Sequence, residues 1–303
     1  MHSRSSKVSV IGAGAVGASM AYAMLIRESA REVVLYDVNE AKATAEVLDL
    51  AHGTQFTGAS SISGGADISQ TANSDVIVIT AGAKQSPGQT RLELAGVNFS
   101  ILKSLLPDLL KHSPEAIIVL VTNPCDVLAT AAQRLTGLPA NRVFSSGTVL
   151  DSSRLRWLLA ERFGVSTANI HANIIGEHGD SEFALWSQAA VGNVPLLDWK
   201  LEDGSTLSRE ELDAIAYSVK TAAYKVIEGK GATNFAIGLS GARIVEAILN
   251  DEHAILPIAM SVPTLVSRNG AVRTIDISME PHEQELFEKS ATAIKASLDS
   301  IGI

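Results

Sequence analysis

The sequence is poor in cysteine and has no surplus of positive charge. Cys125 is the only cysteine, which excludes an internal disulfide framework and a zinc site built from clustered cysteines. We therefore expect a cytoplasmic protein without a metal cofactor. Lysine and arginine total 24 against 33 aspartates and glutamates, whereas general nucleic-acid binders usually carry a basic face. Nucleic acid is therefore not an expected partner.

The sequence also lacks a dense apolar run of the kind that spans a membrane. Residues 8–26 carry no charge and follow a basic start, which resembles a signal peptide or a membrane span. Three glycines interrupt this stretch, and its apolar residues are mostly alanines and short valine and isoleucine runs. A strand followed by a buried helix explains it better, so no membrane partner is expected. With 46% hydrophobic residues, the chain can bury a large core.

Short apolar runs alternate with helix-like segments through the first half of the chain. The runs at 75–80 and 116–121 are almost continuously apolar, as expected of strands buried on both faces of a parallel sheet. The alternation indicates βαβ units and an α/β fold, a doubly wound parallel sheet with helices on both faces. The expected strands are 7–11, 32–36, 75–80 and 116–121, and the expected helices are 15–30, 41–51 and 91–112.

The second half has a different pattern and predicts a mixed α+β domain. We place the boundary in the Ser/Gly-rich turn at 145–147, which divides the chain into residues 1–145 and 146–303. The length is typical of two domains. Helices are expected at 151–163, 210–228, 234–249 and 282–301, and strands at 169–175, 183–191 and 275–279.

A glycine-rich turn, Gly-Ala-Gly-Ala-Val-Gly at 12–17, joins the first expected strand to the first expected helix. Gly12 permits a tight turn, Gly14 leaves room for a pyrophosphate, and Gly17 lets the helix and strand pack closely. The helix N-terminus adds free N–H groups and a positive dipole that attract phosphates. This pattern is typical of a Rossmann-type dinucleotide-binding sheet. Val16, in the same turn, is a further candidate contact to the cofactor.

Asp37 ends the second expected strand, 20 positions after Gly17. A carboxylate here can accept hydrogen bonds from ribose hydroxyls and would repel a 2′-phosphate, which favours NAD over NADP. The alternative is an α/β protein that binds no dinucleotide, with Asp37 a solvated strand end. Gly82 and Asn123 follow later strands, and ligands of open sheets bind at this carboxyl edge. Asn123 can hydrogen-bond a ribose, a nicotinamide or a substrate hydroxyl, or it can serve only a turn.

His178 stands out among seven histidines because it lies in a glycine-rich turn after an apolar strand. An enzyme that oxidises an alcohol with a nicotinamide needs a base that titrates near neutrality, and histidine is the usual one. A lone histidine in such a turn is more often structural, so the neighbouring residues must decide whether His178 is catalytic.

Asp151 and Arg154 are three positions apart at the start of an expected helix, so they share one face. They can simply pair with each other. Alternatively, Asp151 holds the N–H of an imidazole and Arg154 binds a substrate carboxylate through two parallel hydrogen bonds. The loop at 83–91 contains Pro and Gly and suits a segment that closes over a site. Arg91 would then polarise a substrate carbonyl, or it is a solvated residue of a surface loop.

Together these motifs resemble the L-lactate/malate dehydrogenase family, in the same order along nearly the whole chain. The resemblance implies an NAD-dependent oxidoreductase in which His178 exchanges a proton and Asp151 is its partner. It also implies that Arg154 clamps the substrate carboxylate and that Arg91 polarises the carbonyl. Asn123 would contact substrate or nicotinamide, with a cis bond to the next proline. The motifs that carry the resemblance are 12–17, Asp37, 85–91, 121–124, 146–154 and 176–181.

One loop position separates the two substrates within this family. Malate dehydrogenases usually have an arginine there, which matches the second carboxylate of oxaloacetate, whereas this chain has Gln85. Burying a charge without a partner is costly, while glutamine tolerates a methyl group. Thr233 also resembles the lactate-type pocket. We therefore expect lactate and pyruvate as substrates. A malate dehydrogenase, or a dinucleotide-binding protein without catalysis, is the alternative.

Two further features concern regulation and assembly. Arg156 and His171 resemble positions where bacterial lactate dehydrogenases bind fructose 1,6-bisphosphate between subunits, although an exposed helix face and a strand also explain them. The family implies an oligomer, and we expect a homotetramer. Relatives have a longer connection between Met260 and Ser261, and two antiparallel strands need a turn. Either the hairpin is lost, or residues are missing from the sequence at this junction, and we favour the second interpretation.

Overall fold

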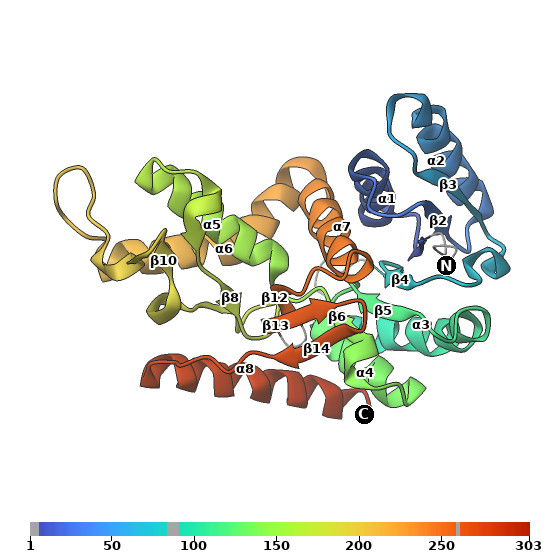
Figure 1. Ribbon diagram of the computed structural model, residues 1–303. Helices are drawn as coiled ribbons and strands as arrows, with labels where there is room; N and C mark the ends of the chain where they lie inside the picture. Colours follow the sequence, from blue (N-terminus) through green and yellow to red (C-terminus); the bar gives the residue numbers. More distant parts are fainter. Residues whose placement is uncertain (1–5, 84–90, 259–260) are drawn as a thin grey trace.

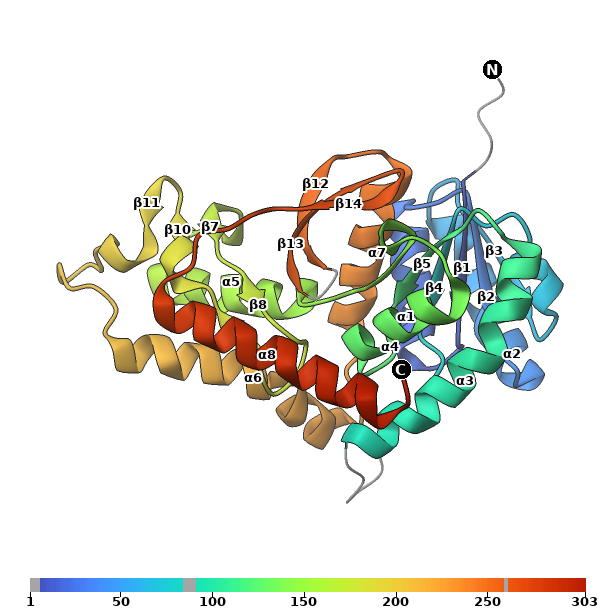
Figure 2. The same ribbon diagram turned by 90° about the horizontal axis from the view of Figure 1, so that it is seen from below.

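A six-stranded parallel sheet forms the centre of the first half of the molecule (Figures 1 and 2). The computed structural model describes residues 6–83, 91–258 and 261–303. The strand order is β3-β2-β1-β4-β5-β6, which is the order of two βαβ halves wound outward from β1 and β4. The strands are β1 (Lys7–Ile11), β2 (Glu32–Tyr36), β3 (Ser61–Gly65), β4 (Val76–Ile79), β5 (Ile117–Leu120) and β6 (Val143–Ser145).

Helices cover both faces of this sheet. The central strands β4 and β5 consist of Val, Ile and Leu and are wholly buried, because each face packs on helices. Side chains of α1 and α7 cover one face, and side chains of α3 and α4 cover the other. The helices that follow the strands are α1 (Ala15–Arg27), α2 (Glu40–His52), α3 (Arg91–His112) and α4 (Cys125–Thr136).

Helix α7 (Phe235–Leu249) comes from the second half of the chain but packs directly on α1 (Figure 1). A Cβ on Gly238 would lie 2.9 Å from the backbone of Ser19, so the two helices approach closely. Arg27 and Glu246 join them by two hydrogen bonds of 2.7 Å. The core under α1 therefore combines residues from both sides of the turn at 145–147.

The second half is built around α5 (Val149–Phe163) and α6 (Arg209–Lys230), with short antiparallel strands beside them. Gly164 ends α5 in the left-handed conformation, as the sequence predicts. The short strands are β7 (Ile170–His171), β8 (Ile174–Ile175), β9 (Phe183–Ala184), β10 (Ala190–Val191) and β11 (Val194–Pro195).

An antiparallel sheet of β12 (Ala254–Ile258), β13 (Val262–Ser267) and β14 (Gly270–Thr274) follows α7. Ile258 pairs with Val262, which leaves only residues 259–261 for the connection. Residues 259 and 260 lie outside the described part of the chain. The pairing of β12 with β13 is continuous up to this connection, and the expectation of missing residues at the junction stays a prediction.

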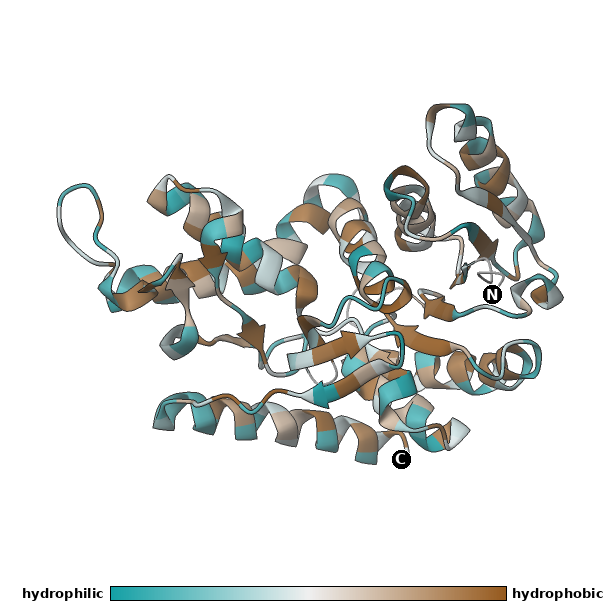
Figure 3. Ribbon diagram, in the orientation of Figure 1, coloured by the Kyte–Doolittle hydropathy of each residue, from teal (hydrophilic) through white to brown (hydrophobic). Residues whose placement is uncertain are grey.

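Helix α8 (Pro281–Ser300) lies along both halves of the molecule and ends beside α4 (Figures 1 and 2). Hydrophobic and hydrophilic residues alternate along α6 and α8 (Figure 3), as expected of helices that bury one face. Ile294 and Leu298 of α8 pack on Val127 and Ala131 of α4. Among the described helices, none is long and apolar enough to cross a membrane.

The predicted α/β class and the mixed second half are confirmed. Three strand predictions are wrong. The segment 169–175 is divided into β7 and β8, which belong to different sheets, and the segment 183–191 is interrupted by a 3₁₀ turn at Trp186–Gln188. The segment 275–279 forms no strand, although the N–H of Ile275 donates to the Pro263 carbonyl of β13. The strand β14 lies just before it, where Gly270 and an exposed polar face gave no apolar signal.

Candidate active site

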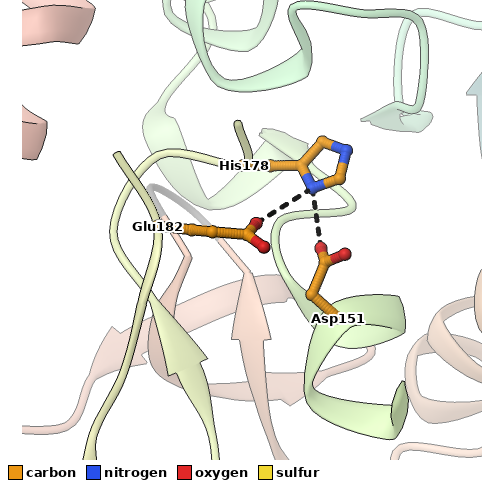
Figure 4. Close-up of side chains that lie close together, drawn as sticks. All are labelled: Asp151, His178 and Glu182. Carbon is orange, nitrogen blue, oxygen red and sulfur yellow. Dashed lines mark hydrogen bonds and ion pairs between the residues drawn. The ribbon is translucent and has the colours of Figure 1, made fainter. Parts of the chain in front are cut away.

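His178 and Asp151 meet although 27 positions separate them in the sequence. Asp151 lies in the first turn of α5, and His178 lies in the turn after β8. The Nδ1 atom of His178 is 2.7 Å from Oδ2 of Asp151, and Figure 4 shows the other ring nitrogen pointing away from both carboxylates. The Asp151 side chain is only 1% exposed, whereas that of His178 is 25% exposed. The imidazole is thus anchored through Nδ1 and leaves Nε2 open.

Asp151 also binds Arg154. The guanidinium donates from Nη1 to the second carboxylate oxygen, Oδ1, over 2.5 Å. The sequence left open whether Asp151 pairs with Arg154 or holds an imidazole. Asp151 does both, because one carboxylate oxygen pairs with Arg154 while the other holds His178. Arg154 is one-fifth exposed, and its planar fork retains further N–H donors for an anion.

These contacts shift the pKa values of the group. Burial on its own would lower the pKa of His178, but the charge and hydrogen bond of Asp151 outweigh it and raise the pKa to about 9. Burial likewise opposes ionisation of Asp151, yet His178 and Arg154 hold the pKa of that carboxyl below its ordinary value. The geometry therefore favours an imidazolium beside a carboxylate.

The turn that carries His178 is fixed from two other helices. The backbone N–H of His178 donates to Oδ2 of Asp126 on α4 over 2.8 Å. The N–H of Glu177 donates to Oγ of Ser290 on α8. Gly176 has a φ of +91°, and a Cβ there would lie 2.8 Å from the same Ser290 oxygen. A glycine is thus required at 176 both for its backbone angle and for space.

Glu182 completes the group and was not found by the sequence analysis. Its side chain is 5% exposed, and Oε2 lies 3.8 Å from Nδ1 of His178 (Figure 4). Burial is the main cause that raises the pKa of Glu182 to about 8, and the charge of Asp151 adds to it. The only available signal was the spacing of four residues from His178.

Asp151, His178 and Glu182 also offer three metal-ligand atoms within 4.8 Å of one another. A cation would have to displace the proton between Nδ1 and Asp151, and it would compete with Arg154 for the same carboxylate. The arrangement therefore suits proton transfer better than metal binding.

The glycine-rich turn forms the second part of the site. Gly12 has a φ of +108°, and a Cβ on Gly17 would lie 1.9 Å from the Gly12 carbonyl oxygen. Gly14 faces open space, and it precedes α1 without a capping side chain or an acidic residue in the first turn, where Val16 lies partly buried. Asp37 accepts the N–H of Ala13 over 2.8 Å and that of Asn39 over 2.9 Å. This arrangement fits a pyrophosphate at the helix N-terminus and a ribose at Asp37.

Asn98 of α3 was also missed, and it ties two further loops of this edge together. Its amide accepts the N–H of Ala83 and donates to the carbonyl of Asn123, both over 2.7 Å. Gly82 leaves no room for a side chain, because a Cβ would lie 2.3 Å from Thr122. The Asn123 side chain is exposed at the end of β5, and the Asn123–Pro124 bond is cis.

The remaining predicted residues are not part of the group around His178 that the structure describes. Gln85 and the Arg91 side chain lie outside the described residues, and the Arg91 backbone begins α3. Thr233 is partly buried just before α7 and makes no hydrogen bond to the His178 group among the described residues. Arg156 donates to the Ala172 carbonyl over 2.9 Å, which places it beside the strand of the exposed His171.

Comparisons with known proteins identify the family. Residues 6–145 match the lactate/malate dehydrogenase NAD binding domain, and residues 148–302 match the alpha/beta C-terminal domain of the same family.

The chain belongs to the lactate/malate dehydrogenase family.

Individual relatives agree with this membership over nearly their whole length. An L-lactate dehydrogenase of Bifidobacterium animalis subsp. lactis is 46% identical over 98% of this chain and 97% of the relative. An L-lactate dehydrogenase of Synechococcus sp. is 43% identical over 97% of this chain and 99% of the relative. The crystal structure of a minor L-lactate dehydrogenase from Enterococcus mundtii superposes with a TM-score of 0.93 at 38% identity, and 98% of each chain is covered.

Within the lactate/malate dehydrogenase family, the glycine-rich turn, Asp37 and Asn123 fall in the NAD binding domain. His178, Asp151, Arg154 and Glu182 fall in the C-terminal domain. The predicted family, fold class and NAD cofactor are thereby confirmed.

Proposed function

We infer that this chain is an NAD-dependent L-lactate dehydrogenase, which interconverts L-lactate and pyruvate. The observation that carries the inference is the contact of His178 with Asp151 beside Arg154, in a chain whose relatives of 39–46% identity are L-lactate dehydrogenases. When bound, NAD⁺ would supply the hydride acceptor for oxidation of lactate at C2, and NADH the hydride donor for reduction of pyruvate. All other steps fall to side chains of this chain.

His178 moves the proton in this proposal. Its Nδ1 atom is held by Asp151, so Nε2 is the ring nitrogen left open for a substrate oxygen. During pyruvate reduction the imidazolium donates its Nε2 proton to the carbonyl oxygen, and during lactate oxidation the neutral imidazole accepts the hydroxyl proton. The raised pKa of His178 keeps the imidazolium populated at neutral pH, which favours reduction of pyruvate.

Arg154 binds the carboxylate that lactate and pyruvate share. The hydrogen bond to Asp151 fixes its guanidinium near His178, and a charge-assisted fork then orients the substrate. Arg91 is proposed to polarise the carbonyl, and Asn123 to contact the substrate or the nicotinamide. Asp37 and the turn from Gly12 to Gly17 would hold the adenosine ribose and the pyrophosphate.

Gln85 and Thr233 are proposed to select pyruvate over oxaloacetate. Neither side chain carries a positive charge that could pair with a second carboxylate, and leaving that charge unpaired in a closed site costs several kcal/mol. We therefore expect kcat/KM for pyruvate to exceed that for oxaloacetate by at least about 100-fold.

A steady-state assay with both keto acids tests this function. The variant Gln85→Arg should raise kcat/KM for oxaloacetate, and His178→Asn should lower kcat for pyruvate by about 10²–10⁴-fold. A preference for oxaloacetate in the unmodified protein would identify a malate dehydrogenase instead. Absence of turnover with either keto acid, while NADH still binds, would identify a binding protein without catalysis.

We further propose a homotetramer that responds to fructose 1,6-bisphosphate through Arg156 and His171. Arg156 and Arg243 line a cavity of 610 Å³, and His171 is not among its described lining residues. Arg156 bonds to Ala172 and Asn173, and Arg243 pairs with Glu252. A phosphorylated ligand would have to take over these guanidinium contacts. Exposed apolar residues also line this cavity, which supports contact with a second copy of this chain. They are Trp157, Leu239 and Ile255, each more than half exposed. The cytoplasm remains the proposed location.

A further inference from the structure

The Nδ1 atom of His178 faces two carboxyl groups, and the mechanism above uses only one of them. Asp151 lies 2.7 Å from it and Glu182 lies 3.8 Å from it, and Figure 4 shows both carboxylates on the same side of the ring. Glu182 comes from the same loop as His178, four residues later, and its side chain is almost completely buried. A buried carboxyl group next to an acid–base histidine is a candidate for a function in proton transfer.

We propose that Glu182 is a positioning residue that acts through His178: by losing or gaining its own proton, it changes how readily the imidazole releases a proton. This proposal rests on the proposed function, in which His178 carries the proton. Glu182 itself faces Nδ1 and not Nε2, so it does not touch the reacting atoms.

Burial and the charges around Glu182 explain why its pKa is close to that of His178. Burial and the negative charge of Asp151 favour its protonated form, while the positive charges of His178 and Arg154 oppose that effect. Asp126 adds a further negative charge beside His178 from α4. As a result, the pKa of Glu182, about 8, is close to that of His178, about 9. At mildly alkaline pH the protonation of each group therefore affects the protonation of the other.

Glu182 also lines a cavity of 140 Å³ between α6 and α8, which is large enough for water. None of the residues that line this cavity is His178, Asp151 or Arg154, so water in it would contact Glu182 from the side of α6 and α8. The titratable and charged residues that share this cavity are Arg209, Asp213, Tyr217, Lys220 and His282.

The sign of the effect follows from the charges. When the pH rises, Glu182 loses its proton and adds a negative charge near Nδ1, which stabilises the imidazolium and keeps His178 protonated to higher pH. Glutamine has nearly the same shape but stays neutral. Glu182→Gln should therefore lower the pKa of His178 by about one unit.

Two measurements on the full-length protein test this proposal. The first is an NMR titration of ring-labelled histidine, with the His178 signal assigned from its loss in His178→Asn. The second is the pH profile of kcat/KM for pyruvate reduction, which falls once His178 loses its proton. In Glu182→Gln both transitions should move to lower pH by about one unit. The matched control is Glu202→Gln, an exposed glutamate, which should move neither.

The outcomes separate the two proposals. If the unmodified protein reduces pyruvate but His178 titrates identically in Glu182→Gln, the role of Glu182 is refuted. If the NMR transition moves but pyruvate is not turned over, the coupling of Glu182 to His178 stands and the proposed function fails. A purely structural role would lower Tm without moving either transition. Should Glu182→Gln fold poorly, Glu182→Asp keeps a charge at shorter reach and should move both transitions by a smaller amount; no movement there also refutes the proposal.

Discussion

Asp151 divides its two carboxylate oxygens between a histidine and an arginine. Oδ2 holds the imidazole and Oδ1 holds the guanidinium, and the carboxylate itself is 1% exposed. A buried carboxylate between two cations compensates both charges without solvent. The acid–base group and the proposed substrate clamp are therefore oriented by one residue, and their separation is fixed by the width of a single carboxylate.

Arg154→Lys tests the clamp at the scale of one side chain. Lysine keeps the charge but loses the planar fork that binds a carboxylate through two hydrogen bonds. We expect KM for pyruvate to rise about 10- to 100-fold, since a charge-assisted hydrogen bond is worth about 1.5–3 kcal/mol, with little change in KM for NADH. Arg162→Lys is the matched control, because Arg162 lies on the same helix and pairs with Glu211 at the surface. An unchanged KM for pyruvate in Arg154→Lys would remove Arg154 from the substrate site.

Single residues were predictable where a motif fixes their neighbours. Asp151 and Arg154 share a helix face by their spacing, so their proximity follows from the sequence alone. The burial of Glu182 does not, because it depends on how a loop after β8 packs against α5 and α6. Asn98 is likewise an ordinary polar residue of a helix until the fold brings Ala83 and Asn123 to its amide.

Helix α8 supports the catalytic turn from a distance of more than 100 residues in the sequence. Ser290 on α8 is 1% exposed and accepts the N–H of Glu177, and its Oγ also lies 3.0 Å from Oγ of Ser181. The position of the turn that holds His178 therefore depends on the seating of the last helix.

Ser290→Ala removes this support. It leaves a buried N–H without an acceptor, which costs about 1–3 kcal/mol, so Tm should fall by several degrees in a thermal melt. Because His178 follows Glu177 directly, kcat for pyruvate should fall as well, while KM for NADH stays unchanged. Ser300→Ala is the control, since Ser300 is exposed and its hydroxyl donates to the Ser297 carbonyl of the same helix. Equal Tm and kcat in Ser290→Ala and the unmodified protein would contradict this role of α8.

The elements themselves were predictable to different degrees. The strand β4 was found because Val-Ile-Val-Ile is apolar on both faces, and β1 and β2 were predicted with their observed ends. The strand β3 was missed because Ser-Ile-Ser-Gly-Gly carries no such signal and joins the sheet edge through backbone hydrogen bonds. Strand propensity depends on the side chains of a segment. It cannot detect β3, because this strand is defined by its pairing with β2.

At the scale of the assembled molecule, the proposed effector site has a direct test. Fructose 1,6-bisphosphate should lower the apparent KM for pyruvate in the unmodified protein and have no effect on Arg156→Ala. Arg162→Ala, on the same helix, should still respond. Sedimentation should give the mass of four chains. A response that survives in Arg156→Ala would refute the effector site, and a monomer in sedimentation would refute the tetramer.

The seating of α7 on α1 has a practical consequence for anyone who cuts this chain. Met20, Met24 and Val33 share their core with Ala242, Val245 and Ile258, which a fragment ending at residue 145 would lose. The truncated piece would present a wide apolar surface to water and would tend to aggregate. A chimaera that exchanges the nucleotide-binding half between homologues must therefore carry α7 and the hairpin of β12 and β13 along with it.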